Sequence, residues 1–194
     1  MTAARPWRRG VPDFCAIDFE TANEHSNSAC ALGVARVAKG RVVATATWLV
    51  RPPFRRFEYK SIHGIGWRAV KTAPTLAELW PAVEPWIKGC RFLAAHNAAF
   101  DKKVLAASLE PAQADASRLP PFLCTVALAR FMWGTEHAGL ARVARALKIP
   151  LVHHDPASDA RACAEIILHA QRDWWRSSAT SLDLFELCMP QCAR

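Results

Sequence analysis

Apolar and polar positions alternate along the first third of the chain, as is typical of β-strands. The alternation predicts strands over residues 14–19, 29–37 and 42–50. A turn at Lys39-Gly40 separates the second strand from the third. Three strands in succession predict a sheet that starts antiparallel.

Helical periodicity begins after residue 75. It predicts helices over 75–88, 97–109, 126–133, 140–148 and 158–174, with a short strand at 91–95 and a loop over 110–121. Thr75 and Glu78 form a capping box for the first helix, Pro81 and Pro85 weaken its prediction, and Asn97 is the expected cap of the second. Strands followed by strand–helix alternation predict an α/β fold, a mixed sheet covered by helices.

Composition limits the class of protein. The 194 residues suit one domain, and 52% hydrophobic with 22% charged residues exclude a disordered or low-complexity chain. No stretch free of Asp, Glu, Lys and Arg exceeds eleven residues, so no membrane-spanning helix is expected. The basic N-terminus lacks the apolar run of a secretory signal, and we expect a cytoplasmic protein.

The seven cysteines bear on whether the chain has disulfides or a zinc site, and the net charge of +8 bears on its partners. An odd number of scattered cysteines does not predict a disulfide framework, and Cys188 and Cys192 lack the second pair that a zinc site needs. The positive charge suits a polyanionic partner such as nucleic acid, but it equally suits solubility alone.

Acidic residues at the edges of predicted elements are the main candidates for chemistry. Asp18 and Glu20 stand two apart on the first strand and therefore leave the same face, opposite Cys15, Ile17 and Phe19. Two buried carboxylates repel each other unless a cation lies between them. The alternative is an exposed strand end.

Two further acids begin predicted helices. Asp101 follows a short buried strand, although alone it could simply favour the positive end of the helix dipole. Asp159 shares a helix face with Cys163, Ile166 and Ala170 and so points inward, where a metal would explain it. His154 lies five residues before Asp159.

These segments together resemble the DEDDh 3′–5′ exonucleases, the DnaQ-like group related to the proofreading epsilon subunit of DNA polymerase III. Residues 14–21 (FCAIDFET) resemble the first motif, residues 96–101 (HNAAFD) the second, and His154 with Asp159 the third. Residues 62–65 (IHGI) and 124–125 (CT) also resemble recurring family segments. One departure is Pro156, where the family usually has a small residue.

The resemblance implies a ribonuclease-H-like fold, a central mixed five-stranded sheet flanked by helices. It implies an exonuclease domain over residues 12–174, with extensions at 1–11 and 175–194. The implied activity is metal-dependent hydrolysis of phosphodiester bonds from the 3′ end of single-stranded DNA, releasing nucleoside 5′-monophosphates by a two-metal mechanism.

The resemblance also assigns roles to residues. Two Mg²⁺ or Mn²⁺ ions would be held by Asp18, Glu20, Asp101 and Asp159, and His154 would act as general base. The alternative for His154 is a structural cap, and His153 is its rival as base. The terminal nucleotide would lie near Thr21, His63, Ile65 and Asn97, although Ile65 and Trp67 equally suit a core.

Partners stay open at this stage. Single-stranded DNA ends are favoured and RNA is the alternative within the family, while the apolar residues of 174–185 leave room for a polymerase-associated binding module. Nothing in the sequence predicts an oligomeric state. The basic residues expected near the strand are Arg51, Arg55, Arg56, Lys60, Lys102 and Lys103.

Overall fold

A five-stranded sheet forms the centre of the computed structural model, which describes residues 11–110 and 119–177. Its spatial order is β3-β2-β1-β4-β5. The strands are β1 (Phe14–Thr21), β2 (Ala29–Ala38), β3 (Arg41–Leu49), β4 (Leu93–Ala95) and β5 (Phe122–Cys124). The first three pair antiparallel, whereas β4 runs parallel to both β1 and β5. The mixed sheet predicted from the sequence is confirmed.

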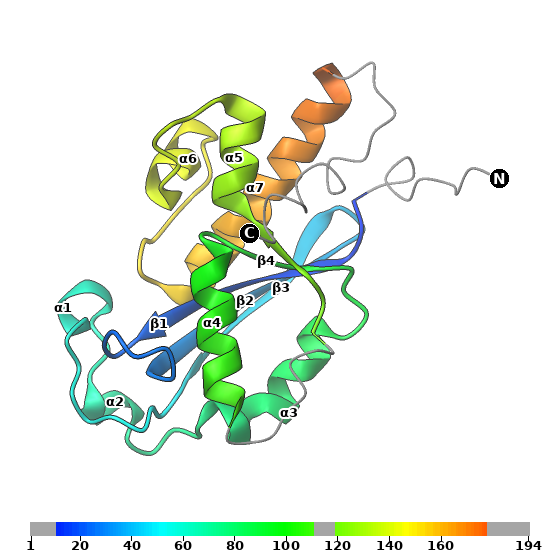
Figure 1. Ribbon diagram of the computed structural model, residues 1–194. Helices are drawn as coiled ribbons and strands as arrows, with labels where there is room; N and C mark the ends of the chain where they lie inside the picture. Colours follow the sequence, from blue (N-terminus) through cyan, green and yellow to red (C-terminus); the bar gives the residue numbers. More distant parts are fainter. Residues whose placement is uncertain (1–10, 111–118, 178–194) are drawn as a thin grey trace.

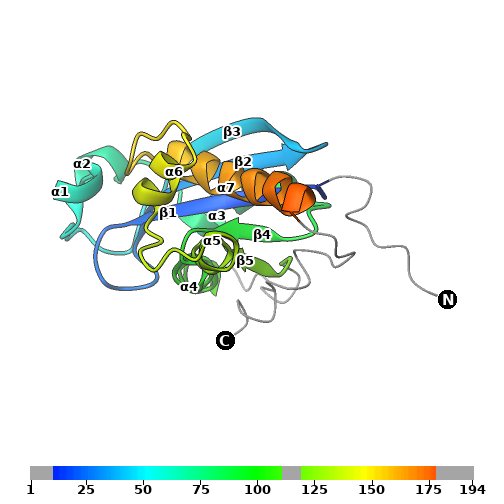
Figure 2. The same ribbon diagram turned by 90° about the horizontal axis from the view of Figure 1, so that it is seen from above.

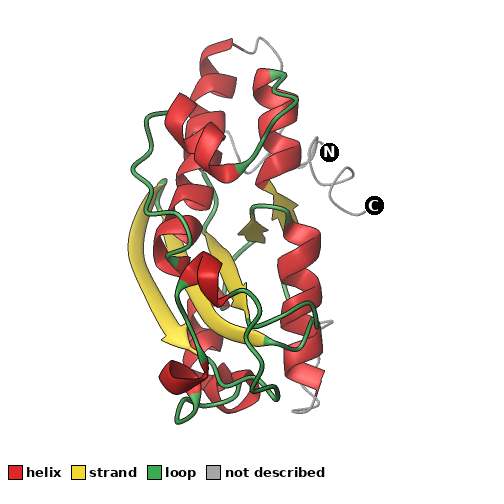
Figure 3. Cartoon of the chain, turned by 90° about the vertical axis from the view of Figure 1, so that its left-hand side faces the viewer, coloured by secondary structure: helices red, strands yellow, loops and turns green. Residues whose placement is uncertain are grey.

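Helices cover both faces of the sheet. They are α1 (Lys60–His63), α2 (Trp67–Val70), α3 (Leu76–Ile87), α4 (Ala98–Leu109), α5 (Thr125–Trp133), α6 (Leu140–Ala146) and α7 (Pro156–Ser177). One face carries α7, which contacts α5 and α6, and the other face carries α3 and α4 (Figures 1 and 2). The short helices α1 and α2 lie at the end of the sheet toward which β1 runs, the end that Figure 3 views directly. No helix in the described part of the chain is long and apolar enough to cross a membrane.

Most predicted elements are present, with shifted ends. The capping box of Thr75 and Glu78 forms, and both prolines of α3 are exposed and tolerated inside the helix. Three elements were missed: β5, which begins directly after the predicted loop, and the four-residue helices α1 and α2. Asn97 is the N-cap residue of α4, as predicted, but its backbone is left-handed (φ 75°) and its side chain makes no capping hydrogen bond.

Several predictions concern residues outside the described ranges. These are residues 1–10 and 178–194, which make up most of the two terminal extensions, together with the Cys188 and Cys192 pair and the centre of the loop before β5.

Alternation along β1 divides the core into two layers. Phe14 and Ala16 pack with α7 and α5, while Cys15, Ile17 and Phe19 pack with α3 and α4. Asp18 and Glu20 therefore continue the face that α7 covers, as the two-residue spacing predicts. Burial of that strand on both faces fixes the direction in which the two acids point.

Gly33 lets α7 approach the sheet. It lies opposite Asp18 on β2, and a Cβ atom there would stand 2.0 Å from the Pro156 carbonyl oxygen and 2.6 Å from the Ala157 nitrogen. Both contacts are backbone at the start of α7, so neither can move aside cheaply. The glycine thus fixes how closely the first turn of α7 meets β1.

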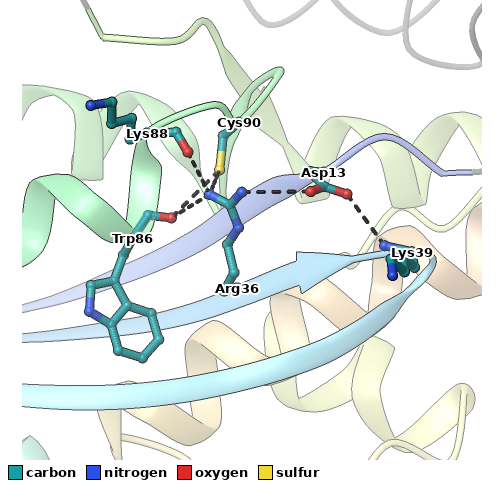
Figure 4. A network of polar contacts seen from close by, with 6 residues as sticks. All are labelled: Asp13, Arg36, Lys39, Trp86, Lys88 and Cys90. Carbon is teal, nitrogen blue, oxygen red and sulfur yellow. Dashed lines mark hydrogen bonds and ion pairs between the residues drawn. The ribbon is translucent and has the colours of Figure 1, made fainter.

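Arg36 holds the end of β2 that lies away from Asp18 and Glu20. Its Nη1 donates to the carbonyl oxygens of Trp86 (2.8 Å) and Lys88 (3.1 Å) at the end of α3 and lies 2.7 Å from the Cys90 sulfur (Figure 4). Its Nη2 pairs with Asp13 at 3.7 Å, just before β1. A cation at a helix C-terminus is favourable, and here it also joins β1, β2 and α3.

Gly33→Ala should destabilise the fold because the added methyl group forces the start of α7 away from β2. We expect a loss of about 1–3 kcal/mol in unfolding free energy, a fall of several degrees in thermal midpoint. Thermal unfolding measures it. Gly139→Ala is the matched control, because nothing lies within 4 Å of a Cβ there. Equal midpoints for the two variants would contradict the close approach.

Candidate active site

Asp18 and Glu20 are the two acids that the sheet contributes to the site, both from β1. They lie opposite Gly33 and Ala31 of β2, and the register shifts just beyond, between Glu20 and Thr21. Glu20 is 9% exposed. Both side chains extend from β1 toward the start of α7. A side chain in the first turn of that helix therefore lies next to them.

Asp159 completes a cluster of three carboxylates. It lies in the first turn of α7, where the Asp155 side chain accepts a hydrogen bond from the Ser158 nitrogen (2.8 Å) and so caps the helix. Pro156 occupies the first helical position, where proline is tolerated. Oxygen atoms of Asp18, Glu20 and Asp159 all lie within 4.8 Å of one another.

Asp101 approaches from the opposite side of the sheet. It lies in the first turn of α4, 2% exposed, and its Oδ1 accepts a hydrogen bond from the Phe19 nitrogen at 3.1 Å. It is near enough to Asp18 for their charges to repel, although it stands outside the three-carboxylate cluster. The structure thus brings all four predicted acids to one place, with Asp101 held apart from the other three.

Burial and repulsion raise the pKa values of three of the acids, Asp18, Glu20 and Asp101. Burial raises the pKa of Asp18 well above its ordinary value, and the charges of Asp101, Asp159 and Glu20 raise it further. The pKa of Glu20 rises to about 7, through burial and then Asp159. Burial raises the pKa of Asp101 to about 8, against the lowering effect of the Phe19 N–H.

The two adjacent histidines differ in what their rings contact. His153 Nδ1 donates to Asp159 Oδ2 at 3.0 Å, and the His154 backbone nitrogen donates to the same oxygen at 3.0 Å. The His154 ring stacks on that of His153 with centroids 4.0 Å apart. Within the described residues the His154 ring nitrogens make no hydrogen bond.

The backbone of His154 is left-handed, with φ 68°. This conformation lets its N–H turn back toward Asp159, and the Val152 N–H donates to Ser158 Oγ (2.8 Å) in the same loop. The loop before α7 is therefore closed on the first turn of the helix by two backbone donors, which places both imidazoles beside the carboxylates.

His63 has both ring nitrogens engaged. Nδ1 accepts from the Ile65 N–H (3.1 Å), so Nε2 carries the proton and donates to the Thr21 carbonyl oxygen (3.1 Å). Burial lowers the pKa of His63, and the nearby His154 lowers it further. The structure thus brings His63, Ile65 and Thr21 together beside His154, while Asn97 is exposed at the start of α4.

Sequence reasoning missed part of this arrangement. The pattern gave no signal for the His153–Asp159 bond, whereas a glycine inside a predicted strand signals a close backbone approach and could have singled out Gly33. A buried polar group behind the site was also missed: Thr125 Oγ1 lies 2.9 Å from His96 Nδ1 and 3.6 Å from the Cys163 sulfur.

The donor set fits a hard divalent cation. The carboxylates of Asp18, Glu20 and Asp101 form no ion pair with Lys or Arg within the described ranges, and Asp159 Oδ1 is buried without a hydrogen-bond partner. Clustered, unpaired carboxylate oxygens are the ligands that Mg²⁺ and Mn²⁺ prefer. A bound cation would offset the repulsion among the carboxylates and would give the unpartnered Asp159 oxygen a partner.

Residues 15–167 match the sequence profile of the RNase T family, described as "Exonuclease". The chain belongs to this exonuclease family. The match spans every acid of the site and both histidines. Its members depend on divalent metal, which agrees with the carboxylate cluster found here. No curated protein sequence matches the exonuclease significantly.

Solved exonuclease structures share its fold. Exonuclease X in complex with 5′ overhanging duplex DNA matches at a TM-score of 0.66 and 21% identity, over 93% of this chain and 99% of the other. A 3′-exonuclease that recognises a histone mRNA stem-loop matches at 0.70 and 16%, over 84% and 83%. E. coli Exonuclease I with a dT13 oligonucleotide matches at 0.72 and 14%, over 86% of this chain but 42% of the other.

These matches confirm the ribonuclease-H-like fold that the sequence motifs implied. The family assignment itself makes the chain a nuclease, an enzyme that acts on nucleic acids.

The metal-free exonuclease should lose stability as pH rises from 5.5 to 8.5. Unfolded carboxyls release their protons near pH 4, whereas Glu20 and Asp101 hold theirs until about pH 7 and 8 in the folded state. The folded state binds more protons in this window, so its stability is lost as pH rises through those values. We expect the thermal midpoint in EDTA to fall by roughly 5 °C.

Asp18→Asn should reduce this fall because it removes a carboxyl whose raised pKa makes the folded state bind its proton more tightly than the unfolded state does. Glu136→Gln, at an exposed acid, should leave it unchanged. A midpoint that stays level or rises across the window in the unmodified protein would contradict the buried-carboxylate electrostatics.

Proposed function

We propose that this exonuclease removes nucleotides from the 3′ end of single-stranded DNA, releasing nucleoside 5′-monophosphates. The observation that carries the proposal is the cluster of Asp18, Glu20 and Asp159, with oxygens within 4.8 Å of one another and Asp101 close by. A phosphodiester is anionic, so its hydrolysis needs positive charge and a water-derived nucleophile at neutral pH. Two Mg²⁺ or Mn²⁺ ions bound here would supply both.

The four acids have distinct roles in this proposal. Asp18, whose pKa is raised by burial and by the charges of all three other acids, would hold both ions, while Glu20 and Asp159 would bind the ion on the nucleophile side. Asp101, outside the cluster and already accepting the Phe19 N–H, would act largely through water. The spare oxygen of Asp159 is the one left for a metal, because its partner oxygen already accepts two donors.

His154 is the proposed general base. Its ring is free of hydrogen bonds to the described residues and stands beside the carboxylates, so it can accept the proton of the attacking water. The His153 ring is instead engaged with Asp159 Oδ2. His153 therefore suits the role of a positioning residue that orients the Asp159 carboxylate.

The terminal nucleotide is proposed to lie at Thr21, His63, Ile65 and Asn97. His63 fixes the Thr21 carbonyl and the Ile65 N–H at once, so the backbone next to Glu20 is held in a set position. Ile65 packs partly against Ala22 and Val70. Its partial burial leaves it able both to support the core and to contact a base.

A 5′-labelled 12-nucleotide DNA should shorten from its 3′ end in Mg²⁺ or Mn²⁺ but not in EDTA. Asp18→Asn should lower the rate by roughly two orders of magnitude or more, because it removes a shared metal ligand. Denaturing gels measure the ladder, and a matched RNA strand tests the alternative substrate. Faster cleavage of RNA would move the assignment to an exoribonuclease, and no cleavage of either strand would favour a binding module.

Substitutions at the two histidines should impair different steps: turnover for His154 and metal binding for His153. His154→Gln should lose about 100-fold or more in turnover while Mn²⁺ binding, followed by electron paramagnetic resonance, stays near the unmodified level. His153→Leu should weaken Mn²⁺ binding about 10-fold, because Asp159 loses a donor. His153→Asn keeps a donor near the Nδ1 position and should restore most of it. Equal Mn²⁺ binding in the Leu and Asn variants would refute the positioning role.

A further inference from the structure

The segment from Arg51 to Lys71 holds a disproportionate share of the protein's positive charge. It contains six basic residues and one acidic residue, a net charge of +5, in a chain whose total is +8. We call residues 51–71 the basic segment. Its basic residues are exposed except for the half-buried Arg51. More than half of the net charge therefore lies on about a tenth of the chain.

Most of this charge is not neutralised by ion pairs among the residues that the structure describes. Arg51 pairs with Glu78 (3.4 Å) and Arg56 with Glu58 (2.9 Å). Within the described ranges no ion pair involves the remaining basic residues, Arg55, Lys60, Arg68 and Lys71. A cluster of unpaired cations attracts a polyanion.

The basic segment is fastened beside the carboxylates. The Ala22 carbonyl oxygen accepts hydrogen bonds from the nitrogens of Glu58 (2.7 Å) and Tyr59 (3.3 Å), and the Asn23 side-chain amide donates to the Arg56 carbonyl oxygen at 3.2 Å. Ala22 and Asn23 come directly after Glu20 and Thr21. The charge is thus held next to the end of β1, at the edge of the site (Figures 1 and 3).

Two aromatic contacts order the surface of this region. The rings of His25 and Phe54 are stacked with centroids 4.8 Å apart and an interplanar angle of 21°, and His25 is exposed. The Arg55 guanidinium lies 5.5 Å over the Trp67 ring, whose side chain packs against the core of Ala22, Cys30 and Val70. The Arg55 guanidinium and the His25–Phe54 ring pair are therefore held in set orientations by contacts within the protein.

We propose that the basic segment and the His25–Phe54 pair bind the unpaired part of a nucleic-acid strand beside its reacting end. Arg55 and the other unpaired cations contact phosphates, and the His25–Phe54 pair stacks a nucleobase. Surface charge for solubility alone needs neither the rings nor their contacts, whereas single-strand binding uses both. The inference rests on the proposed function and adds to it: affinity depends on strand length and on bases that are free to stack.

Fluorescence anisotropy of labelled dT2, dT4, dT8 and dT12 in EDTA tests binding separately from cleavage. Affinity should rise with length over this series and should fall steeply with salt. Arg55→Ala should weaken dT12 binding about 10-fold and reduce the slope of log affinity against log salt by about 1. Phe54→Ala should weaken dT12 binding about 10-fold with the slope unchanged. A blunt 12-base-pair duplex should be insensitive to Phe54→Ala.

Arg41→Ala is the matched control, because it removes an exposed cation at the other end of the sheet. It should leave dT12 affinity within about twofold of the unmodified protein. Equal losses for Arg55→Ala and Arg41→Ala would overturn the proposal, as would unchanged dT12 binding by Phe54→Ala. If the unmodified protein cleaves no strand but these binding differences appear, the proposed function fails and only strand binding by the basic segment and the His25–Phe54 pair stands. If it cleaves and they do not appear, only the inference fails.

Discussion

Repulsion among buried carboxylates is the constraint on which the rest of this molecule depends. Asp18, Glu20 and Asp159 share one small space, and the charge of Asp159 adds to the burial that raises the pKa values of Asp18 and Glu20. Hydrogen bonds from Phe19 to Asp101 and from the two histidines to Asp159 offset only part of this repulsion. A cation bound among these carboxylates would offset the remaining repulsion.

The fold brings the four acids together from three segments far apart in the chain, β1, α4 and α7. β1 presents two acids because its alternate residues face α7, and the start of α7 comes close enough because β2 has a glycine at position 33. The Asp155 cap then fixes where the helix begins. Two local features, the missing side chain at Gly33 and the Asp155 cap, therefore set the distances between the acids. Arg36 holds the far end of the same strands against α3, so the sheet is fastened at both ends.

Sequence reasoning went furthest where one periodicity decides the outcome. Alternation placed Asp18 and Glu20 on one face, and Thr75 with Glu78 marked a helix start, because these features depend only on local geometry. Three-residue β5 and four-residue α1 and α2 are too short to show a period, and tertiary contacts decide them. The direction of each histidine ring depends on the left-handed backbone at His154, which no pattern in the sequence marks. The family motifs supplied the metal and substrate roles that composition and spacing left open.

The direction of two elements also determines how the molecule can be attached to other things. β1 enters the sheet at the end away from the carboxylates, and α7 starts at the site and runs for 22 residues, about 33 Å. The first and last described residues of the core therefore both lie far from the mouth of the site (Figure 1). The two ends of the described core, at residues 11 and 177, are therefore on the side of the sheet away from the carboxylates, which suits attachment of a further polypeptide there.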